Sequence, residues 1–210
     1  MKVGVLGTGM VGKAIASRLV ALGHDVMMGS REAGNPKALA WARDAGTLAR
    51  AGTFAEAAAC GEIVFNCTKG AISLDALTAA GEGNLAGKIL VDVANLLPPD
   101  RSRSESLAEV IQQAFPRAKV VKTLNTINCD VMVNPSMLPE PHTVFLSGND
   151  EQAKRTVLGL LESFGWRDVL DLGDLSTARA TEGYLPLWLA AWNVLGTAAF
   201  NVRIVRTGRG

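Results

Sequence analysis

The first twelve residues combine an apolar run with a closely spaced glycine triplet. Val3 to Leu6 is typical of a buried β-strand, and the segment after Gly12 has the apolar spacing of a helix. A strand that runs into Gly7-x-Gly9-x-x-Gly12 and continues as a helix is the fingerprint of a dinucleotide-binding βαβ unit. The chain is therefore expected to begin an α/β fold built on a parallel sheet.

Each glycine of the triplet has a separate role in such a unit. Gly7 permits a tight turn, Gly9 lets the backbone approach a pyrophosphate, and Gly12 lets the helix pack close to the sheet. The helix start adds free N–H groups and a partial positive charge. We expect the pyrophosphate to contact the residues of this turn, which are Gly7, Thr8, Gly9, Met10, Val11 and Gly12.

The end of the second predicted strand (residues 25–28) distinguishes NAD from NADP. An NAD site usually has an acidic residue where this chain has Ser30-Arg31, and Glu32 comes one residue too late. Arg31 offers a planar fork for a phosphate, Ser30 adds a hydroxyl donor, and Lys37 adds charge. We predict NADP(H) as the cofactor, with Arg31 as a merely solvated surface charge left as the alternative.

The rest of the chain predicts a doubly wound parallel sheet. Strand-like and helix-like runs alternate to Asn125, and a second, shorter strand–helix–strand pattern follows an Asn- and Pro-rich loop. We expect residues 1–125 to form an NADP-binding Rossmann domain and residues 126–210 a small C-terminal α/β lobe that covers the cleft. Arg179 and Glu182 are expected to pair. The other predicted elements are helices at 36–45, 54–59 and 104–115, a helix capped by Asn149 and Gln152 that ends at Gly165, a short strand near Thr47, and strands at 63–67, 89–93, 119–124, 143–146 and 169–171.

Three loops that follow buried strands in the second half of this sheet are expected to border the nicotinamide. Their polar and apolar side chains include Thr68, Lys69, Asn95, Leu97, Asn125, Thr126 and Asn128. These loops comprise residues 68–70, 95–97 and 125–128; none contains a histidine or an acidic residue, and no nucleophile–base pair stands out elsewhere. Hydride transfer between two preformed rings needs alignment and little acid–base assistance, so this composition favours such a reaction. Lys69 could donate a proton, but we favour the interpretation that it is a solvated loop lysine.

Composition excludes several other classes of function. The chain has 210 residues, of which 48% are hydrophobic, and a formal net charge of +1, which gives no reason to expect nucleic acid or an acidic membrane surface. The three cysteines, Cys60, Cys67 and Cys129, lack metal-ligand spacing and predict buried thiols in a reducing compartment, with no metal site. Because the first strand occupies the place of a signal peptide, we expect a cytoplasmic protein.

The segment from Gly183 to Val202 contains no charged residue and has roughly the length of a membrane-spanning helix. Pro186 and several polar neighbours argue against a span, so we predict none. Trp188 and Trp192 lie four residues apart and hence on one helical face. They fit a core, an interface between two copies, or the wall of a site for a flat ring. We predict a buried or interface helix and a homodimer.

Four segments together resemble one enzyme family. They are the Gly7–Gly12 turn, Gly29-Ser30-Arg31, Lys122-Thr123-Leu124-Asn125-Thr126 and Asp174-Leu175-Ser176-x-Ala178-Arg179. The chain resembles, over nearly its whole length, the NADPH-dependent oxidoreductases of the deazaflavin coenzyme F420. The wider group includes the cytosolic reductase domains of six-transmembrane metalloreductases.

The resemblance implies a hydride passing between NADPH and a deazaflavin that lie face to face. It places Thr8 to Val11 at the pyrophosphate and Ser30, Arg31 and Lys37 at the 2′-phosphate. Thr68, Leu97 and the segment Asn125, Thr126, Ile127, Asn128 and Cys129 would border the two rings. The archaeal enzymes have a histidine in place of Asn125 and a proline in place of Asn128. This departure leaves a deazaflavin, a flavin or a small oxidised substrate open as the hydride acceptor.

We therefore predict an NADPH-dependent oxidoreductase that exchanges a hydride with a deazaflavin or flavin ring, with Asn125 and Thr126 positioning the rings. One alternative is a reductase of a small imine or carbonyl substrate, similar to pyrroline-carboxylate reductases in its first domain. The short C-terminal part argues against this alternative. Another alternative is a non-catalytic NADP(H)-binding redox sensor, which needs no acid–base residue either.

Overall fold

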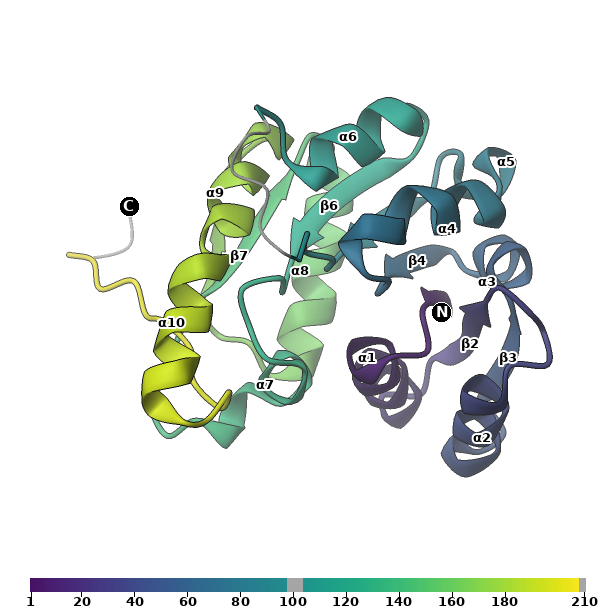
Figure 1. Cartoon of the computed structure of the whole chain (residues 1–210), viewed down its shortest axis with the longest axis horizontal. Helices are drawn as coiled ribbons and strands as arrows, with labels where there is room; N and C mark the ends of the chain where they lie inside the picture. The colour runs from purple at the N-terminus through teal and green to yellow at the C-terminus, as the bar shows by residue number, and fades with distance from the viewer. Residues whose placement is uncertain (98–103, 208–210) are drawn as a thin grey trace.

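One continuous twisted sheet organises the computed structural model, which describes residues 1–97 and 104–207 (Figure 1). In that part of the chain the sheet has eight strands in the order β3-β2-β1-β4-β5-β6-β7-β8. All neighbouring strands are parallel except β6 and β7. The order from β3 to β6 is that of a doubly wound, dinucleotide-binding Rossmann sheet, so the predicted fold class is confirmed. The strands are β1 (Lys2–Leu6), β2 (Asp25–Ser30), β3 (Ala49–Thr53), β4 (Ile63–Asn66), β5 (Ile89–Asp92), β6 (Lys119–Thr123), β7 (Val144–Gly148) and β8 (Val169–Asp171).

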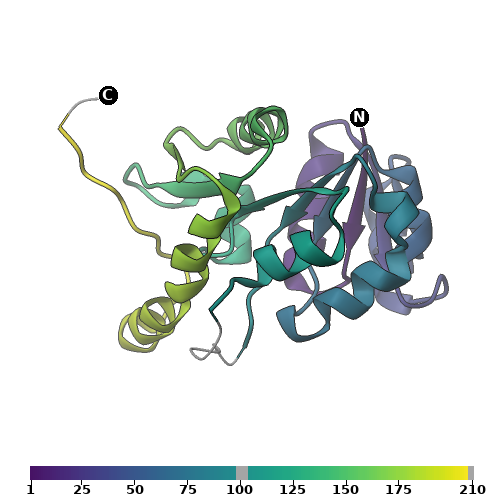
Figure 2. The same cartoon turned by 90° about the horizontal axis from the view of Figure 1, so that it is seen from above.

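Helices cover both faces of the sheet (Figure 2). Helices α1, α2, α7 and α8 contribute to the hydrophobic cluster on one face, and α3 to α6 with α9 contribute to the cluster on the other. The α-helices are α1 (Met10–Ala21), α2 (Pro36–Ala45), α3 (Phe54–Cys60), α4 (Ser73–Ala80), α5 (Glu82–Leu85), α6 (Leu107–Ala114), α7 (Cys129–Val133), α8 (Glu151–Phe164), α9 (Ala178–Gly183) and α10 (Leu185–Leu195). Short 3₁₀ helices span Gly70–Ile72, Pro135–Met137 and Leu175–Thr177.

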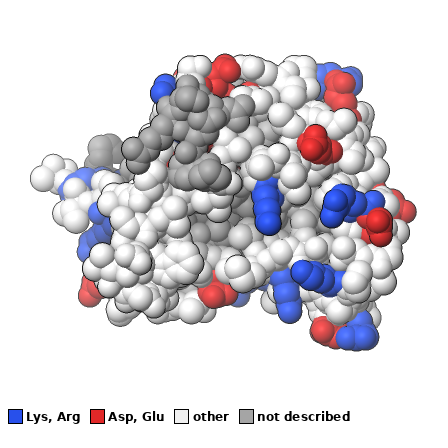
Figure 3. All heavy atoms as spheres, in the orientation of Figure 1, with Lys and Arg blue, Asp and Glu red and all other residues white. Residues whose placement is uncertain are grey.

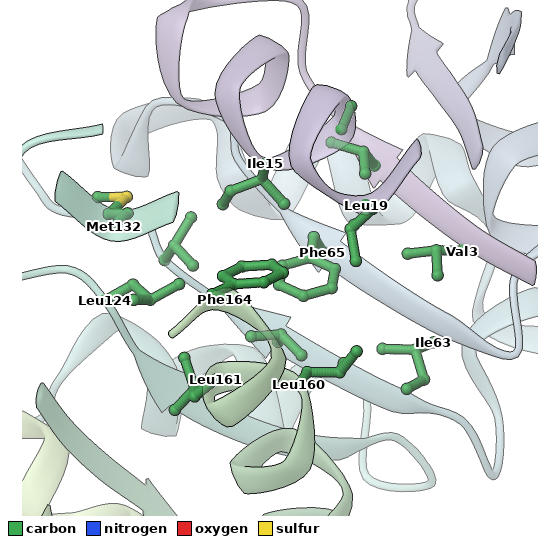
Figure 4. Packing of buried hydrophobic residues seen from close by; sticks show 14 of the residues in the cluster. Val3, Ile15, Leu19, Ile63, Phe65, Leu124, Met132, Leu160, Leu161 and Phe164 are labelled. Carbon is green, nitrogen blue, oxygen red and sulfur yellow. The ribbon is translucent and has the colours of Figure 1, made fainter. Parts of the chain in front are cut away.

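The buried strands follow the alternation expected of a sheet with two covered faces. Ile63 and Phe65 of β4 face the α1 side, whereas Val64 between them faces the other cluster. Figure 4 shows Phe164 of α8 lying against Phe65 beneath α1. The C-terminal part of the chain therefore shares the hydrophobic core of the first half.

The C-terminal part of the chain also continues the sheet of the first half. Strands β7 and β8 extend the same sheet beyond β6, and β7 is antiparallel to β6. The division at Asn125 into a Rossmann domain and a covering lobe stays a prediction.

Two predicted strands form with shifted bounds. The predicted strand near Thr47 forms at Ala49–Thr53, and the strand predicted at 143–146 forms at Val144–Gly148.

The start of α8 differs from the prediction. Its N-cap is Asp150, whose side chain accepts a hydrogen bond from the Ala153 N–H at 2.7 Å. The predicted capping box of Asn149 and Gln152 is therefore wrong by one residue. The Asn149 side chain instead accepts a hydrogen bond from the Leu175 N–H at 2.9 Å, which ties the loop before α8 to the segment before α9.

The apolar C-terminal segment does not form a buried helix. In α10 Leu185 is buried, whereas Leu187 is 62% exposed and Val194 is 84% exposed. Trp188 packs between Trp192 and Phe200, with ring centroids 5.4 and 5.3 Å away. Of the helices that the structure describes, none is long and apolar enough to cross a membrane.

The cysteines also differ from the prediction. Cys60, Cys67 and Cys129 are free thiols and each is half-buried, not fully buried.

Candidate functional site

Close backbone contacts shape the glycine turn between β1 and α1. Gly7 has a φ of +120°, and a Cβ atom there would lie 2.7 Å from the Cys67 carbonyl oxygen. A Cβ atom on Gly12 would overlap the Gly7 carbonyl oxygen, so both positions require glycine. Apart from its two neighbours in the chain, no described residue has an atom within 4 Å of a Cβ atom built on Gly9. Gly9 therefore faces open space, as a residue that admits a ligand to the backbone should.

The first turn of α1 provides unpaired backbone donors. The first hydrogen bond within the helix runs from the Lys13 N–H to the Gly9 carbonyl oxygen at 2.9 Å. The N–H groups of the preceding residues therefore have no acceptor in the helix, and Gly9 has no side chain to accept from them. Together with the helix dipole, these N–H groups suit a pyrophosphate.

The end of β2 lies beside this turn, because the Gly7 N–H donates to the Gly29 carbonyl oxygen at 3.0 Å. Ser30 is buried, and its hydroxyl donates to the Glu32 carbonyl oxygen at 2.5 Å. A hydroxyl has one hydrogen, so Ser30 stabilises the turn here. Donation from Ser30 to a 2′-phosphate would require this bond to break.

Arg31 and Lys37 are both exposed, and Lys37 lies in the first turn of α2 behind its Asn35 cap. Figure 3 shows Lys and Arg side chains gathered over the half of this face on which β1 to β3, α1 and α2 lie. Cations at this end of the sheet suit a 2′-phosphate, and the assignment of Arg31 and Lys37 to it stays a prediction.

Asn95 joins the loops that follow β4, β5 and β6. Its carbonyl oxygen accepts from the Gly70 N–H at 3.1 Å. Its side-chain amide donates to the Asn125 carbonyl oxygen at 2.6 Å and accepts from the Asn125 side chain at 3.0 Å. The structure thus brings the three loops together beside the glycine turn.

The chain reaches this Asn pair through an unusual backbone conformation. Leu124 has a φ of +63°, which is uncommon for a residue with a side chain. Asn125 and Thr126, which follow it, are buried. The Asn128 side chain accepts from the Asp130 N–H at 2.9 Å and so caps α7. Hydrogen bonds therefore hold the loop after β6 near its start, at Asn125, and at its end, at Asn128.

The remaining predicted residues lie around this point. Thr68 is half-buried, Lys69 is exposed, and Leu97, the last described residue before 98–103, is 61% exposed. Cys129 is half-buried at the start of α7. Burial raises the pKa of the Cys129 thiol, and the neighbouring Asp130 raises it further. Both effects favour the thiol over the reactive thiolate of Cys129.

A buried ionic network lies behind these loops. Lys122 on β6 donates to Asp92 on β5 at 2.8 Å and to the Ala94 carbonyl oxygen at 2.5 Å. Both side chains of this ion pair are fully buried. Burial favours the neutral amine, but the carboxylates of Asp92 and Glu182 outweigh it and raise the pKa of Lys122 above its usual value. Lys122 is therefore a buried cation.

Glu182 on α9 completes this network. Its carboxylate lies 2.9 Å from the Lys122 ammonium and accepts from the Leu107 N–H, at the start of α6, at 2.8 Å. The predicted pairing of Glu182 with Arg179 is wrong. The Glu182 side chain instead fastens α9 to β6 and α6.

The sequence-based interpretation missed this network, although a signal was present. Asp92 ends the apolar run Ile89-Leu90-Val91, and Lys122 interrupts the apolar strand that begins at Lys119. The two charged residues are direct partners in the register of β5 and β6. Opposite charges on adjacent buried strands indicate an ion pair once the strand order is known.

The end of the site that is predicted to meet the rings is suited to positioning rather than proton transfer. Residues 68–70, 95–97 and 125–128 present amides, hydroxyls and the exposed Lys69. The Cys67 thiol beneath the glycine turn has a pKa raised chiefly by burial, with Asp92 contributing, so it stays neutral. Such groups can hold and orient flat polar rings by hydrogen bonds.

Comparisons with known proteins identify the family of the chain. Residues 2–96 match the family described as NADP oxidoreductase, coenzyme F420-dependent. A solved structure from Arthrobacter sp. FB24, for which F420-dependent NADP reductase activity has been suggested, is 48% identical in sequence with a TM-score of 0.91. That likeness covers 98% of this chain and 100% of the other. The chain belongs to the coenzyme F420-dependent NADP oxidoreductase family.

Two further relatives differ in how much of their length this chain covers. The F420-dependent NADP reductase of Methanocaldococcus jannaschii is 29% identical over 210 residues, which cover 89% of this chain and 90% of that protein. Metalloreductase STEAP3 of Rattus norvegicus is 34% identical over 197 residues, which are 92% of this chain. The chain spans only 38% of the length of that metalloreductase. As a member of the F420-dependent family, the protein is an NADP-dependent oxidoreductase with a Rossmann fold.

The described residues fit NADP(H) as the family's cofactor. Gly9 leaves open space in front of the backbone, and the start of α1 supplies N–H donors. Ser30 and Arg31 stand where an NAD-specific site would have a carboxylate.

Proposed function

We propose that this protein transfers a hydride reversibly between NADP(H) and a deazaflavin ring of the F420 type, with a flavin as the second choice of acceptor. The observation that carries the proposal is the composition of three segments that follow β4, β5 and β6, which are residues 68–70, 95–97 and 125–128. Hydrogen bonds of Asn95 with Asn125 and with Gly70 join these segments, which offer hydrogen bonds but contain no histidine or carboxylate. Two preformed redox rings need alignment, which such groups supply.

The residues of the chain would divide the work of binding. The start of α1 would hold the pyrophosphate, and Arg31 with Lys37 would hold the 2′-phosphate. Asn125 and Thr126 would fix the orientation of the nicotinamide and its partner ring. NADPH itself supplies the hydride when it is bound. The reduced ring also takes up one proton at a ring nitrogen, and solvent can supply it, so no proton donor is required of the protein.

The extent of each likeness favours a deazaflavin over other acceptors. The likeness to the Arthrobacter structure and to the Methanocaldococcus reductase covers at least 90% of those proteins, whereas the likeness to the metalloreductase covers 38% of it. A metalloreductase-like electron path would depend on segments outside that likeness. The first experiment mixes the purified protein with NADPH and oxidised coenzyme F420 and follows the loss of the deazaflavin's visible absorbance.

The expected result is catalytic bleaching that is faster with NADPH than with NADH. No bleaching of F420, combined with turnover of FMN or FAD, would move the assignment to the flavin. Turnover of a small cyclic imine, with no turnover of either ring acceptor, would support the alternative function of an imine reductase. NADPH binding without turnover of any acceptor would favour the redox sensor.

We also propose that the protein is a cytoplasmic homodimer that pairs through α10. This helix leaves Leu187, Val194 and Leu195 between 56% and 84% exposed. Apolar side chains clustered in this way on a solvent-facing helix are costly in a monomer. The three free thiols suit the reducing conditions of the cytoplasm.

A further inference from the structure

Asn66 stands between the buried ion pair and the loop after β4, and its amide can point in only one direction. One oxygen of the Asp92 carboxylate accepts from the Asn66 Nδ2 at 2.8 Å, while the other accepts from Lys122. On the opposite side the backbone N–H of Thr68 donates to the Asn66 Oδ1 at 3.3 Å. An ionised carboxylate cannot donate and a backbone N–H cannot accept, so the two neighbours fix the amide orientation.

The orientation of Asn66 decides what the Thr68 hydroxyl can do. The Thr68 Oγ1 lies 2.6 Å from the Asn66 Oδ1, which is an acceptor. Thr68 must therefore donate its single hydrogen to Asn66. Ser73 accepts from the Asn66 Nδ2 at 3.0 Å, and its own hydroxyl can donate to the Thr68 Oγ1 at 3.0 Å or to the Lys69 carbonyl oxygen at 3.3 Å. A hydroxyl oxygen has two lone pairs, so Thr68 can accept from Ser73 and still accept from a ligand. The Thr68 oxygen keeps a lone pair but has no hydrogen to offer an incoming ligand.

Thr68 lies where the strand order of the sheet reverses. Its neighbour Cys67 donates its N–H to the Leu6 carbonyl oxygen at 2.9 Å. A Cβ atom built on Gly7 would lie 3.3 Å from the Thr68 nitrogen, so Thr68 adjoins the glycine turn. In this fold the dinucleotide crosses the sheet at that reversal, with the nicotinamide on the β4 side. Thr68 is half-buried and adjoins the space expected for that ring.

We propose that Thr68 is a specificity-determining residue that accepts a hydrogen bond from the carboxamide NH₂ of the nicotinamide. Asn66 is the positioning residue that keeps Thr68 an acceptor, with Asp92 and Lys122 behind it. The inference rests on the proposed function, since it requires NADP(H) at this end of the sheet. The carboxamide is the only group on the nicotinamide ring with N–H donors, so this bond would fix how the ring is turned.

The test compares two ligands that differ in those donors. Dissociation constants are measured by calorimetry for NADP⁺ and for its 3-acetylpyridine analogue, in which a methyl ketone replaces the carboxamide. The wild-type protein is expected to prefer NADP⁺ by about tenfold, the size of one hydrogen bond. Thr68→Val, which is isosteric and lacks the hydroxyl, should lose this preference while its affinity for the analogue is unchanged. Thr68→Ser, the matched control, should keep the preference.

Asn66→Ala tests the positioning role with the same readout. Without Asn66 the Thr68 hydroxyl is free to donate, so the preference for NADP⁺ should fall toward that of Thr68→Val. If Asn66 had only a structural role, Asn66→Ala would lower the affinity for both ligands by the same factor. The ratio of the two dissociation constants would then stay unchanged. If Asn66→Ala does not fold, the two Thr68 variants decide the proposal.

An unchanged ratio in Thr68→Val, or equal losses for both ligands, would overturn the inference and leave the proposed function intact. Failure of the wild-type protein to bind NADP⁺ would instead overturn the proposed function.

Discussion

The ammonium group of Lys122 lies 2.8 Å from the carboxylate of Asp92, and neither side chain is exposed to solvent. The two residues face each other across adjacent parallel strands, directly beneath the loops that are expected to hold the nicotinamide. Burial of a charge is costly unless it is paired and fully hydrogen-bonded, and all three N–H groups of Lys122 have acceptors here. The pair therefore organises this end of the site.

Lys122→Met should destabilise the protein strongly. Removing the cation leaves the Asp92 carboxylate buried without its partner, which typically costs about 3–5 kcal/mol. The matched control is Lys119→Met on the same strand, where the ion pair with Asp150 is partly exposed. That substitution should cost at most about 1 kcal/mol. Urea denaturation of the two variants measures the difference, and equal losses would contradict the role given to the buried pair.

The stability of the protein should depend on Lys122 at high pH. Its pKa is raised in the folded state because the Asp92 and Glu182 carboxylates outweigh the effect of burial. A raised lysine pKa stabilises the fold fully below the unfolded value of about 10.4, and this contribution is lost as the pH rises through the folded value. The stability gap between wild type and Lys122→Met should stay constant from pH 7 to 9 and narrow only above about pH 10.4. Urea titrations across that range test this, and a gap that narrows near pH 8 would argue against a charged Lys122.

Gly9→Ala should impair cofactor binding, whereas Gly12→Ala should impair the stability of the fold. Apart from its two chain neighbours, a methyl group on Gly9 meets no described residue within 4 Å, so the free energy of unfolding should change by less than about 1 kcal/mol. The same methyl group would stand where the pyrophosphate is expected, and NADPH affinity should fall at least about tenfold. Gly12→Ala, whose Cβ overlaps the Gly7 carbonyl oxygen, should destabilise the fold by roughly 1–3 kcal/mol. Unchanged NADPH binding in a folded Gly9→Ala protein would place the pyrophosphate elsewhere.

Arg31→Ala should weaken the binding of NADPH and leave the binding of NADH nearly unchanged. A charge-assisted bond to the 2′-phosphate is worth about 1.5–3 kcal/mol, which corresponds to a rise of roughly ten- to a hundredfold in the Michaelis constant for NADPH. Arg43→Ala is a suitable control, because Arg43 is an exposed α2 residue that pairs only with its neighbour Asp44 among the described residues. Steady-state kinetics with both cofactors measure the effect. Equal losses for NADPH and NADH would refute the role of Arg31.

Leu187→Glu should dissociate a dimer that pairs through α10. Leu187 is 62% exposed, so a charge there costs the monomer little but would be buried in the interface. Leu39→Glu, which changes a 50% exposed leucine on α2, is the control. Sedimentation velocity should give a monomer for the first variant and a dimer for the second. A dimeric Leu187→Glu protein would remove α10 from the interface.

The first half of the fold was predictable because its signals are local. The Gly7–Gly12 turn follows an apolar strand, and the runs at β4 and β5 are apolar enough to be buried on both faces. Helix α2 was predicted with both ends correct, and the structure shows that the Asn35 side chain caps its start. The cap of α8 was misplaced by one residue, because Asn149 and Asp150 are both good caps and a contact with Leu175 decides between them.

The sequence alone determined the parallel Rossmann sheet and the glycine turn, since each depends on residues close together in the chain. Only the tertiary structure decided that Asn95 meets Asn125 and that Glu182 bonds Lys122 rather than Arg179. Those contacts join residues 30 to 60 positions apart, and strand order and register bring them together. A charged residue in an apolar strand shows that a partner must exist, but only the packed fold shows which residue that partner is.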